Sequence, residues 1–224
     1  MKNVNVIIPI GKSEKVNGIV TLPETAPNGT GAVLAHGAGN DMTHPMMEFL
    51  GNGLAHAGYT TLRFNFLYRD KGKKAPDKQD LLYSAWEGAY RFLAGHREYP
   101  VHRILAAGKS MGGRIASQMA AEGKLPVDRL IFLGYPLHPA GQKDKLRDRH
   151  LYDIGVPMLF FAGTRDPLCD LDLLKTVLPS LKAPWKLEII EGGDHSFNVP
   201  KSAVMGAEEV FSLILERMLG WMEA

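Results

Sequence analysis

From residue 31 onward, the sequence alternates short apolar runs with longer segments of helical periodicity. Runs that are apolar throughout are typical of parallel strands, because helices cover both faces of a parallel sheet. Each run is bounded by Gly, Pro or polar residues, and the expected strands cover residues 31–36, 60–66, 103–108, 129–136, 157–163 and 186–192. This alternation predicts βα units built around one buried sheet.

Two further segments, residues 4–10 and 17–23, precede this pattern and are β-branched and alternating, which predicts an antiparallel hairpin at the start of the fold. The expected helices cover residues 45–58, 78–96, 113–123, 170–181 and 202–224. A chain of 224 residues has room for one α/β domain with a substantial core, and a second domain of full size would be cramped. We therefore expect a single domain over residues 1–224, with a mostly parallel eight-stranded sheet and helices on both faces.

Charge and composition narrow the possible partners. The 26 basic and 24 acidic residues leave a net charge of +2, too small to indicate nucleic acid or an anionic membrane surface as partner. No apolar run approaches the roughly 20 residues that cross a bilayer, and the N-terminal segment lacks the apolar stretch of a signal peptide. The single cysteine, Cys169, cannot form an intrachain disulfide and is interpreted as a packed thiol. A cytoplasmic location is the prediction, and the oligomeric state is left open.

The stretch GKSMGGR, residues 108–114, fits two motifs at first sight. A phosphate-binding P-loop requires a glycine at the position of Arg103, so this interpretation fails. The alternative is G-x-S-x-G, a sharp turn between a strand and a helix that presents a nucleophilic serine. A strand is expected before Ser110 and a helix after it, and Gly108 and Gly112 provide the small residues that such a turn needs.

A serine nucleophile needs a base and a group that orients the base, and both are expected at the ends of later strands. Asp166 follows the strand at 157–163, with Asp170 and Asp172 just downstream as alternatives, and His195 follows the strand at 186–192. His195 would accept the proton of Ser110, while Asp166 would hold the imidazole in the right tautomer. Asp194 adjoins His195, but successive side chains diverge, and we interpret it as a turn residue.

An oxyanion hole requires two main-chain N–H groups close to the nucleophile. Met111 would supply one, at the start of the helix that follows Ser110. Ala38 is the candidate for the second, in the Gly-rich loop after the strand at 31–36, with Gly39 as the neighbouring alternative. His36 is interpreted as a residue that braces this loop.

The segments HGAG at 36–39, GKSMGG at 108–113, GTRD at 163–166 and GGDHSF at 192–197 together resemble an α/β-hydrolase, and more narrowly the small, capless hydrolases related to dienelactone hydrolases. The likeness extends over essentially the whole chain. It implies an eight-stranded sheet without a large cap, a Ser-His-Asp triad, and hydrolysis of esters without a cofactor. Dienelactone hydrolases themselves carry cysteine where this chain has Ser110, and some relatives of this fold serve as scaffolds without a triad.

We therefore expect a serine hydrolase that cleaves small carboxylic esters through an acyl-enzyme on Ser110, in an open site. An amidase, peptidase or thioesterase would use the same triad, and a binding or scaffold protein would share the fold. No cluster of ligand-type residues predicts a metal. Lys109 is interpreted as facing solvent, and Met46, Met47 and Phe49 as helix core. The candidate pocket walls are Asn40, Tyr135, Leu137, His138 and Phe197.

Overall fold

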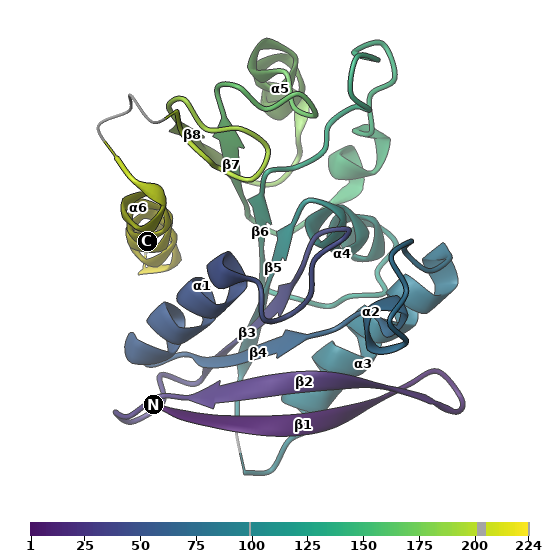
Figure 1. Ribbon diagram of the computed structural model, residues 1–224, viewed down its shortest axis with the longest axis vertical. Coiled ribbons are helices and arrows are strands. Elements are labelled where there is room, and N and C mark those ends of the chain that lie inside the picture. Colours follow the sequence, from purple (N-terminus) through teal and green to yellow (C-terminus); the bar gives the residue numbers. More distant parts are fainter. Residues whose placement is uncertain (99, 201–204, 224) are drawn as a thin grey trace.

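The computed structural model describes residues 1–98, 100–200 and 205–223 (Figure 1). Within them, the eight strands of one sheet are β1 (Lys2–Ile10), β2 (Glu14–Leu22), β3 (Thr30–Ala35), β4 (Thr60–Phe64), β5 (Arg103–Lys109), β6 (Arg129–Leu133), β7 (Met158–Gly163) and β8 (Trp185–Ile190). Their order in space is β1-β2-β4-β3-β5-β6-β7-β8. β1 pairs with β2, and β2 with β4, in antiparallel fashion, whereas every pair from β4 to β8 is parallel.

The longer helices are α1 (Pro45–His56), α3 (Gln79–Ala94), α4 (Met111–Ala121), α5 (Leu171–Val177) and α6 (Ala207–Glu223). These helices cover both faces of the sheet. Alternate side chains of a strand point to opposite faces, so an apolar strand needs a helix layer on each side. In β3, Ala32 and Leu34 pack in the cluster that contains α1 and α6, while Val33 and Ala35 pack in the cluster that contains α3 and α4. Figure 1 shows α1 and α6 on one side of the sheet and α3 and α4 on the other.

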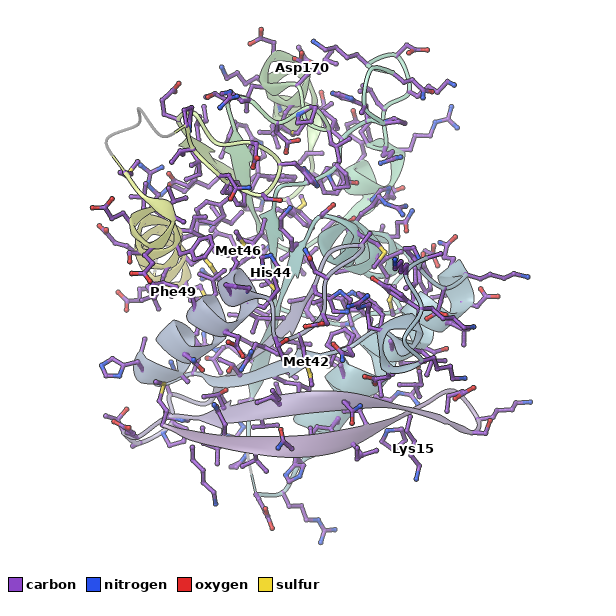
Figure 2. All side chains as sticks on the ribbon, in the orientation of Figure 1. Lys15, Met42, His44, Met46, Phe49 and Asp170 are labelled. Carbon is purple, nitrogen blue, oxygen red and sulfur yellow. The ribbon has the colours of Figure 1, made fainter. Side chains whose placement is uncertain are left out.

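The first helix confirms the interpretation of the Met-rich segment as core. Met46 and Met47 are almost fully buried in the cluster beneath α1. Figure 2 shows Met46 and Phe49 on the side of α1 that faces α6, and the Phe49 ring centroid lies 5.9 Å from that of Phe211. Neither Met46 nor Met47 lines the cavity beside Ser110 described below.

The predicted fold class is confirmed, with differences at the element ends. The strand expected at 129–136 ends at Leu133, since Gly134 has a φ of 69° and turns the chain. Two short helices were not predicted, α2 (Leu67–Asp70) and the 3-10 helix η1 (Arg149–Asp153). The helix expected over 202–224 is described from Ala207 to Glu223, and residues 202–204 and 224 lie outside the described part of the chain. The single-domain organisation stays a prediction.

The topology brings the carboxyl ends of β3, β5, β7 and β8 to one edge of the sheet, where ligands of open α/β sheets bind. In the described chain, β6 and β7 are linked only by loop, turn and η1, so no cap domain covers this edge. Of the helices that the structure describes, none has the length and apolar character to span a membrane.

Candidate active site

Ser110 occupies a strained turn between β5 and α4. Its φ is 49° and its ψ is −113°, a conformation that side-chain-bearing residues rarely adopt, and its main-chain N–H donates to the Leu133 carbonyl at 3.1 Å. The glycines on either side allow this geometry. A Cβ on Gly108 would lie 2.2 Å from the Gly113 nitrogen, and a Cβ on Gly112 would lie 2.7 Å from the carbonyl oxygens of Ala35 and His36.

His195 connects Ser110 to Asp166. Its Nε2 lies 2.8 Å from the Ser110 Oγ, and its Nδ1 lies 2.8 and 3.0 Å from the two carboxylate oxygens of Asp166. The Asp166 side chain is fully buried, so its carboxylate is the natural acceptor for the Nδ1–H. That tautomer leaves the Nε2 lone pair free to accept the proton of the Ser110 hydroxyl.

The loops after β7 and β8 hold Asp166 and His195 in place by contacting one another. The Arg165 N–H donates to the Gly193 carbonyl at 2.9 Å, and Gly192 donates to the Thr164 hydroxyl at 2.8 Å. The loops approach so closely that a Cβ on Gly163 would lie 2.2 Å from the Gly193 oxygen. The Asp194 carboxylate accepts from the main-chain N–H groups of Ser196 and Asn198, so it forms a turn and does not face His195.

Lys109 does not face solvent, so its interpretation from the sequence was wrong. Its side chain is buried, and its Nζ donates to the main-chain carbonyl of His195 at 2.5 Å. The ammonium group also lies 5.8 Å from the centroid of the Phe197 ring. Burial lowers the pKa of Lys109 from 10.5 to about 8, against the attraction of Asp166 and Asp194. The Lys109 ammonium group therefore lies against the main chain of the loop that carries His195.

The loop after β3 brings Ala38 to the same cavity as Ser110 and Met111. His36 braces this loop from inside the protein: its Nδ1 donates to the Gly37 carbonyl at 2.8 Å, and its Nε2 accepts from the Phe66 N–H at 3.1 Å. Burial lowers the pKa of His36 to about 4, so the ring is neutral near pH 7. Met111 begins α4, and the first N–H groups of a helix have no partner within it.

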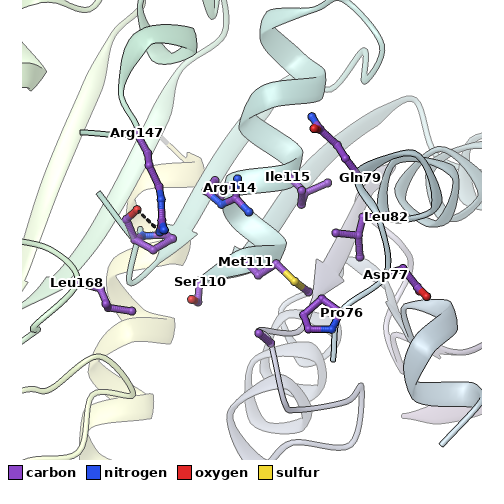
Figure 3. Close-up of a pocket in the computed structure, with 12 residues that line it drawn as sticks. Pro76, Asp77, Gln79, Leu82, Ser110, Met111, Arg114, Ile115, Arg147 and Leu168 are labelled. Atoms are coloured by element: carbon purple, nitrogen blue, oxygen red, sulfur yellow. Dashed lines mark hydrogen bonds between the residues drawn. The ribbon is translucent and has the colours of Figure 1, made fainter. Parts of the chain in front are cut away.

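The cavity beside Ser110 has a volume of about 350 Å³ (Figure 3). Its lining residues come from the loops after β3, β6 and β7, the segment that begins α3, and the first turns of α4: Ala38, Pro76, Asp77, Gln79, Leu82, Ser110, Met111, Arg114, Ile115, Pro136, Arg147 and Leu168. Aliphatic side chains dominate, with polar groups at a few positions, as is typical of small-molecule sites.

A family model described as an alpha/beta hydrolase domain matches residues 29–223, which is most of the chain. The chain belongs to the alpha/beta hydrolase family. This confirms the resemblance inferred from the motifs, and the strand order and lidless edge described above agree with it.

Solved structures similar to this alpha/beta hydrolase include a dienelactone hydrolase from Anabaena variabilis, with 22% identity, a TM-score of 0.75, and coverage of 98% of this chain and 97% of that one. A serine hydrolase without lid from Xanthomonas campestris is 18% identical, with a TM-score of 0.73 and coverage of 98% and 95%. An esterase from Pyrococcus furiosus is 16% identical, with a TM-score of 0.76 and coverage of 98% and 89%. At these identities the likeness shows the shared fold alone.

The five side chains predicted as pocket walls of this hydrolase do not line the cavity beside Ser110, so that prediction is corrected. Asn40 is half-buried in the turn after Gly37, while Leu137 and Phe197 belong to the two core clusters. Tyr135 is buried, and its hydroxyl donates to the Arg147 carbonyl at 2.7 Å.

His138, the fifth predicted wall residue, lines a separate cavity, and its Nε2 accepts from the Asp170 N–H at 3.0 Å. The prediction failed for all five residues for one physical reason. A residue's place after a strand end does not reveal whether its side chain points into the cavity or into the core.

The lining residues that sequence reasoning missed come mainly from segments without a motif. Pro76, Asp77 and Gln79 precede or begin α3, and Arg147 lies in the loop before η1. Arg114 could have been predicted as a lining residue, because it follows Ser110 by four residues at the start of a predicted helix and such pairs share one helix face.

Cys169 is buried, as expected, and burial raises the pKa of its thiol to about 12. Among the described residues, no His, Cys, Asp or Glu side chains gather in a group of three that could hold a metal ion.

Proposed function

We propose that the protein is a serine hydrolase that cleaves small carboxylic esters, with Ser110, His195 and Asp166 as its catalytic triad. The observation that carries this proposal is the continuous hydrogen-bonded series from the Ser110 Oγ through both nitrogens of His195 to the buried Asp166 carboxylate. A hydroxyl is a poor nucleophile near pH 7, and a base at 2.8 Å with a free lone pair is what activates it.

In the proposed mechanism, Ser110 Oγ attacks the ester carbonyl carbon while its proton moves to His195 Nε2. The main-chain N–H groups of Met111 and Ala38 stabilise the oxyanion, and the imidazolium that forms is stabilised by Asp166. When the C–O bond to the alcohol breaks, His195 returns its proton to the departing oxygen. A water molecule then attacks the carbonyl carbon of the acyl-enzyme while its proton moves to His195. The bond between the acyl group and Ser110 Oγ breaks, His195 returns the proton to Ser110, and the carboxylic acid is released.

The conformation of the site supports an enzyme over a scaffold that retains only the fold. A residue held at a φ of 49° costs of order 1–3 kcal/mol, and such strain persists where it serves a purpose. The open edge of the sheet and the small, mainly aliphatic cavity favour compact esters over emulsified lipid. Amides and thioesters would follow the same steps. Amides are harder to cleave because an amine is a poorer leaving group than an alcohol and must be protonated before the C–N bond breaks.

The test is the intact mass of the protein after incubation with a fluorophosphonate, which reacts with activated serines. We expect one adduct on the parent, none on Ser110→Ala, and much slower labelling of His195→Ala. Ser212→Ala, which removes an exposed serine from α6, is the matched control and should label like the parent. A panel of matched 4-nitrophenyl ester, anilide and thioester substrates then ranks the bonds that are cleaved.

An adduct that persists in Ser110→Ala would contradict the proposal, and so would a folded parent that forms no adduct. In the second case, a binding or scaffold role on the same fold would become the better explanation. Circular dichroism of each variant separates loss of reactivity from loss of folding.

A further inference from the structure

Two arginines line the cavity beside Ser110, from different parts of the chain. Arg114 lies one turn into α4, where its N–H donates to the Ser110 carbonyl at 3.0 Å. Arg147 comes from the loop between β6 and η1. Figure 3 shows both side chains above Ser110 in the view. Neither arginine is part of the proposed triad or of the oxyanion hole.

No carboxylate neutralises either guanidinium group within the described part of the chain. Neither arginine forms an ion pair there, although twelve other pairs are present among these residues. Arg147 Nη1 reaches only the Pro136 carbonyl, at 3.4 Å, and the Arg114 guanidinium has no hydrogen-bond partner among the described residues. Asp77 shares the cavity, but its carboxylate accepts from the Tyr68 N–H at 2.7 Å, and Figure 3 shows it at the opposite end from Arg147.

The two cations are close enough to disfavour one another. Burial, and then the positive charge of Arg147, lower the pKa of Arg114. Partial burial of an unpaired charge costs free energy, because solvation is lost and no attraction replaces it. The arrangement of the two guanidinium groups is therefore electrostatically unfavourable by itself, and an anion placed between them would relieve it.

The position of Arg147 is built into the fold. Its main-chain carbonyl accepts from the Tyr135 hydroxyl at 2.7 Å, and its N–H donates to the Leu137 carbonyl at 2.7 Å. Tyr135 is itself buried, and its hydroxyl lies 3.1 Å from His150 Nε2. Tyr135, which we expected at the pocket wall, instead holds the main chain of Arg147, whose side chain lines the cavity.

We propose that the substrate of Ser110 carries an anionic group, a carboxylate or a phosphate, which Arg114 and Arg147 bind while the ester carbonyl lies at Ser110. This inference rests on the proposed ester hydrolysis and specifies its substrate class. Guanidinium groups suit both anions because their N–H groups match paired oxygens. The aliphatic side chains of Met111, Ile115 and Leu168 surround the remaining space, which fits a short apolar spacer between the ester and the anion.

The first experiment compares two esters of the same shape that differ in charge. Mono-4-nitrophenyl glutarate carries a free carboxylate, and its methyl ester, 4-nitrophenyl methyl glutarate, is neutral. Rates are measured at low ionic strength, with Ser110→Ala as the blank for spontaneous hydrolysis. We expect kcat/KM to favour the anionic ester by about 10- to 100-fold, mainly through KM, and the preference to shrink as salt is added.

The arginines are tested by Arg114→Gln and Arg147→Gln, which retain a polar side chain and remove the charge. Each should lower the ratio of kcat/KM for the anionic ester to kcat/KM for the neutral ester about tenfold or more. Arg149→Gln is the matched control, since it removes an exposed arginine two residues from Arg147 that does not line the cavity. Inhibition of neutral-ester hydrolysis by glutarate or by inorganic phosphate shows which anion the site prefers.

Equal rates for the two esters in the parent, or an unchanged preference in both arginine variants, would overturn this inference and leave the proposed hydrolysis intact. Failure of the hydrolysis itself is recognised by the absence of both turnover and fluorophosphonate labelling. The anion site is then tested without turnover, by calorimetric titration of Ser110→Ala with monomethyl glutarate. Binding that Arg147→Gln abolishes supports the site, and the absence of binding at millimolar ligand overturns it.

Discussion

The Lys109 ammonium group donates a hydrogen bond of 2.5 Å to the main-chain carbonyl of His195, which joins the residue before the proposed nucleophile to the loop that carries the proposed base. A Cβ built on Gly134 would lie 3.3 Å from Lys109 Nζ and 3.6 Å from His195 Nδ1, so the cation and the imidazole are close neighbours. The hydrogen bond from Lys109 therefore anchors the loop that carries the proposed base.

Replacing Lys109 by Met should therefore lower kcat/KM for ester hydrolysis by roughly tenfold, because the His195 carbonyl loses a buried donor and the loop that carries the proposed base loses an anchor. Initial rates with a 4-nitrophenyl ester measure this effect. Lys12→Met, which removes an exposed lysine from the turn after β1, controls for net charge and should leave kcat/KM unchanged. A kcat/KM of Lys109→Met equal to that of the parent would contradict this positioning role.

Ser110→Gly should be more stable than Ser110→Ala, although both lack the hydroxyl. Alanine retains the Cβ that is strained at a φ of 49°, whereas glycine adopts this conformation freely. We expect a difference of about 1 kcal/mol in the free energy of unfolding, since part of the relieved strain is offset by the greater freedom of glycine in the unfolded chain. Urea unfolding of the two variants measures it. Equal stabilities would show that the strain relieved by glycine is no larger than the offset from its freedom in the unfolded chain.

Gly108→Ala should lower the free energy of unfolding by several kcal/mol, or prevent folding, because the new Cβ would meet the Gly113 nitrogen at 2.2 Å. Gly220→Ala is the matched control. It lies in α6 with no atom within 4 Å of an added Cβ, so alanine should stabilise the protein by up to about 1 kcal/mol. Thermal unfolding of both variants makes the comparison, and a tolerated alanine at 108 would mean that β5 and α4 pack less closely than described.

His36 should make the protein sensitive to acid. Its pKa is about 4 in the folded protein and about 6.5 when unfolded, so between these values the unfolded state binds more protons. The stabilising effect of the neutral ring is thus complete above pH 6.5 and is lost as the pH falls toward 4. His36→Gln, although less stable at pH 7, should lose about 2 kcal/mol less than the parent between pH 7 and 5.

Urea unfolding at several pH values measures this slope. His102→Gln, which removes an exposed histidine, should retain the slope of the parent. A His36→Gln variant with that same slope would show that His36 is not the group whose protonation is linked to unfolding.

Much of this architecture could be predicted because it depends on periodic patterns and local sterics. The apolar runs at 103–108 and 157–163 coincide closely with β5 and β7, since a parallel strand buried on both faces requires apolar residues throughout. The turn at Ser110 was predictable for a similar reason: only small residues are accommodated at Gly108 and Gly112. The proximity of Ser110, Asp166 and His195 followed from their places after three parallel strands, whose carboxyl ends share one edge.

What the sequence determined by itself is therefore the order of strands and helices, the strained turn, and the candidate triad. Each strand, helix, turn and triad member is indicated by a pattern in its own neighbouring residues. Tertiary structure alone decided which side chains face the cavity. Lys109 points inward to the His195 carbonyl, and Tyr135 supports Arg147 from within the core. Arg114 and Arg147 line one cavity although they lie 33 positions apart in the sequence. Such contacts depend on how loops fold over the sheet edge, and the packing that directs a loop leaves no periodic signal in the loop's own residues.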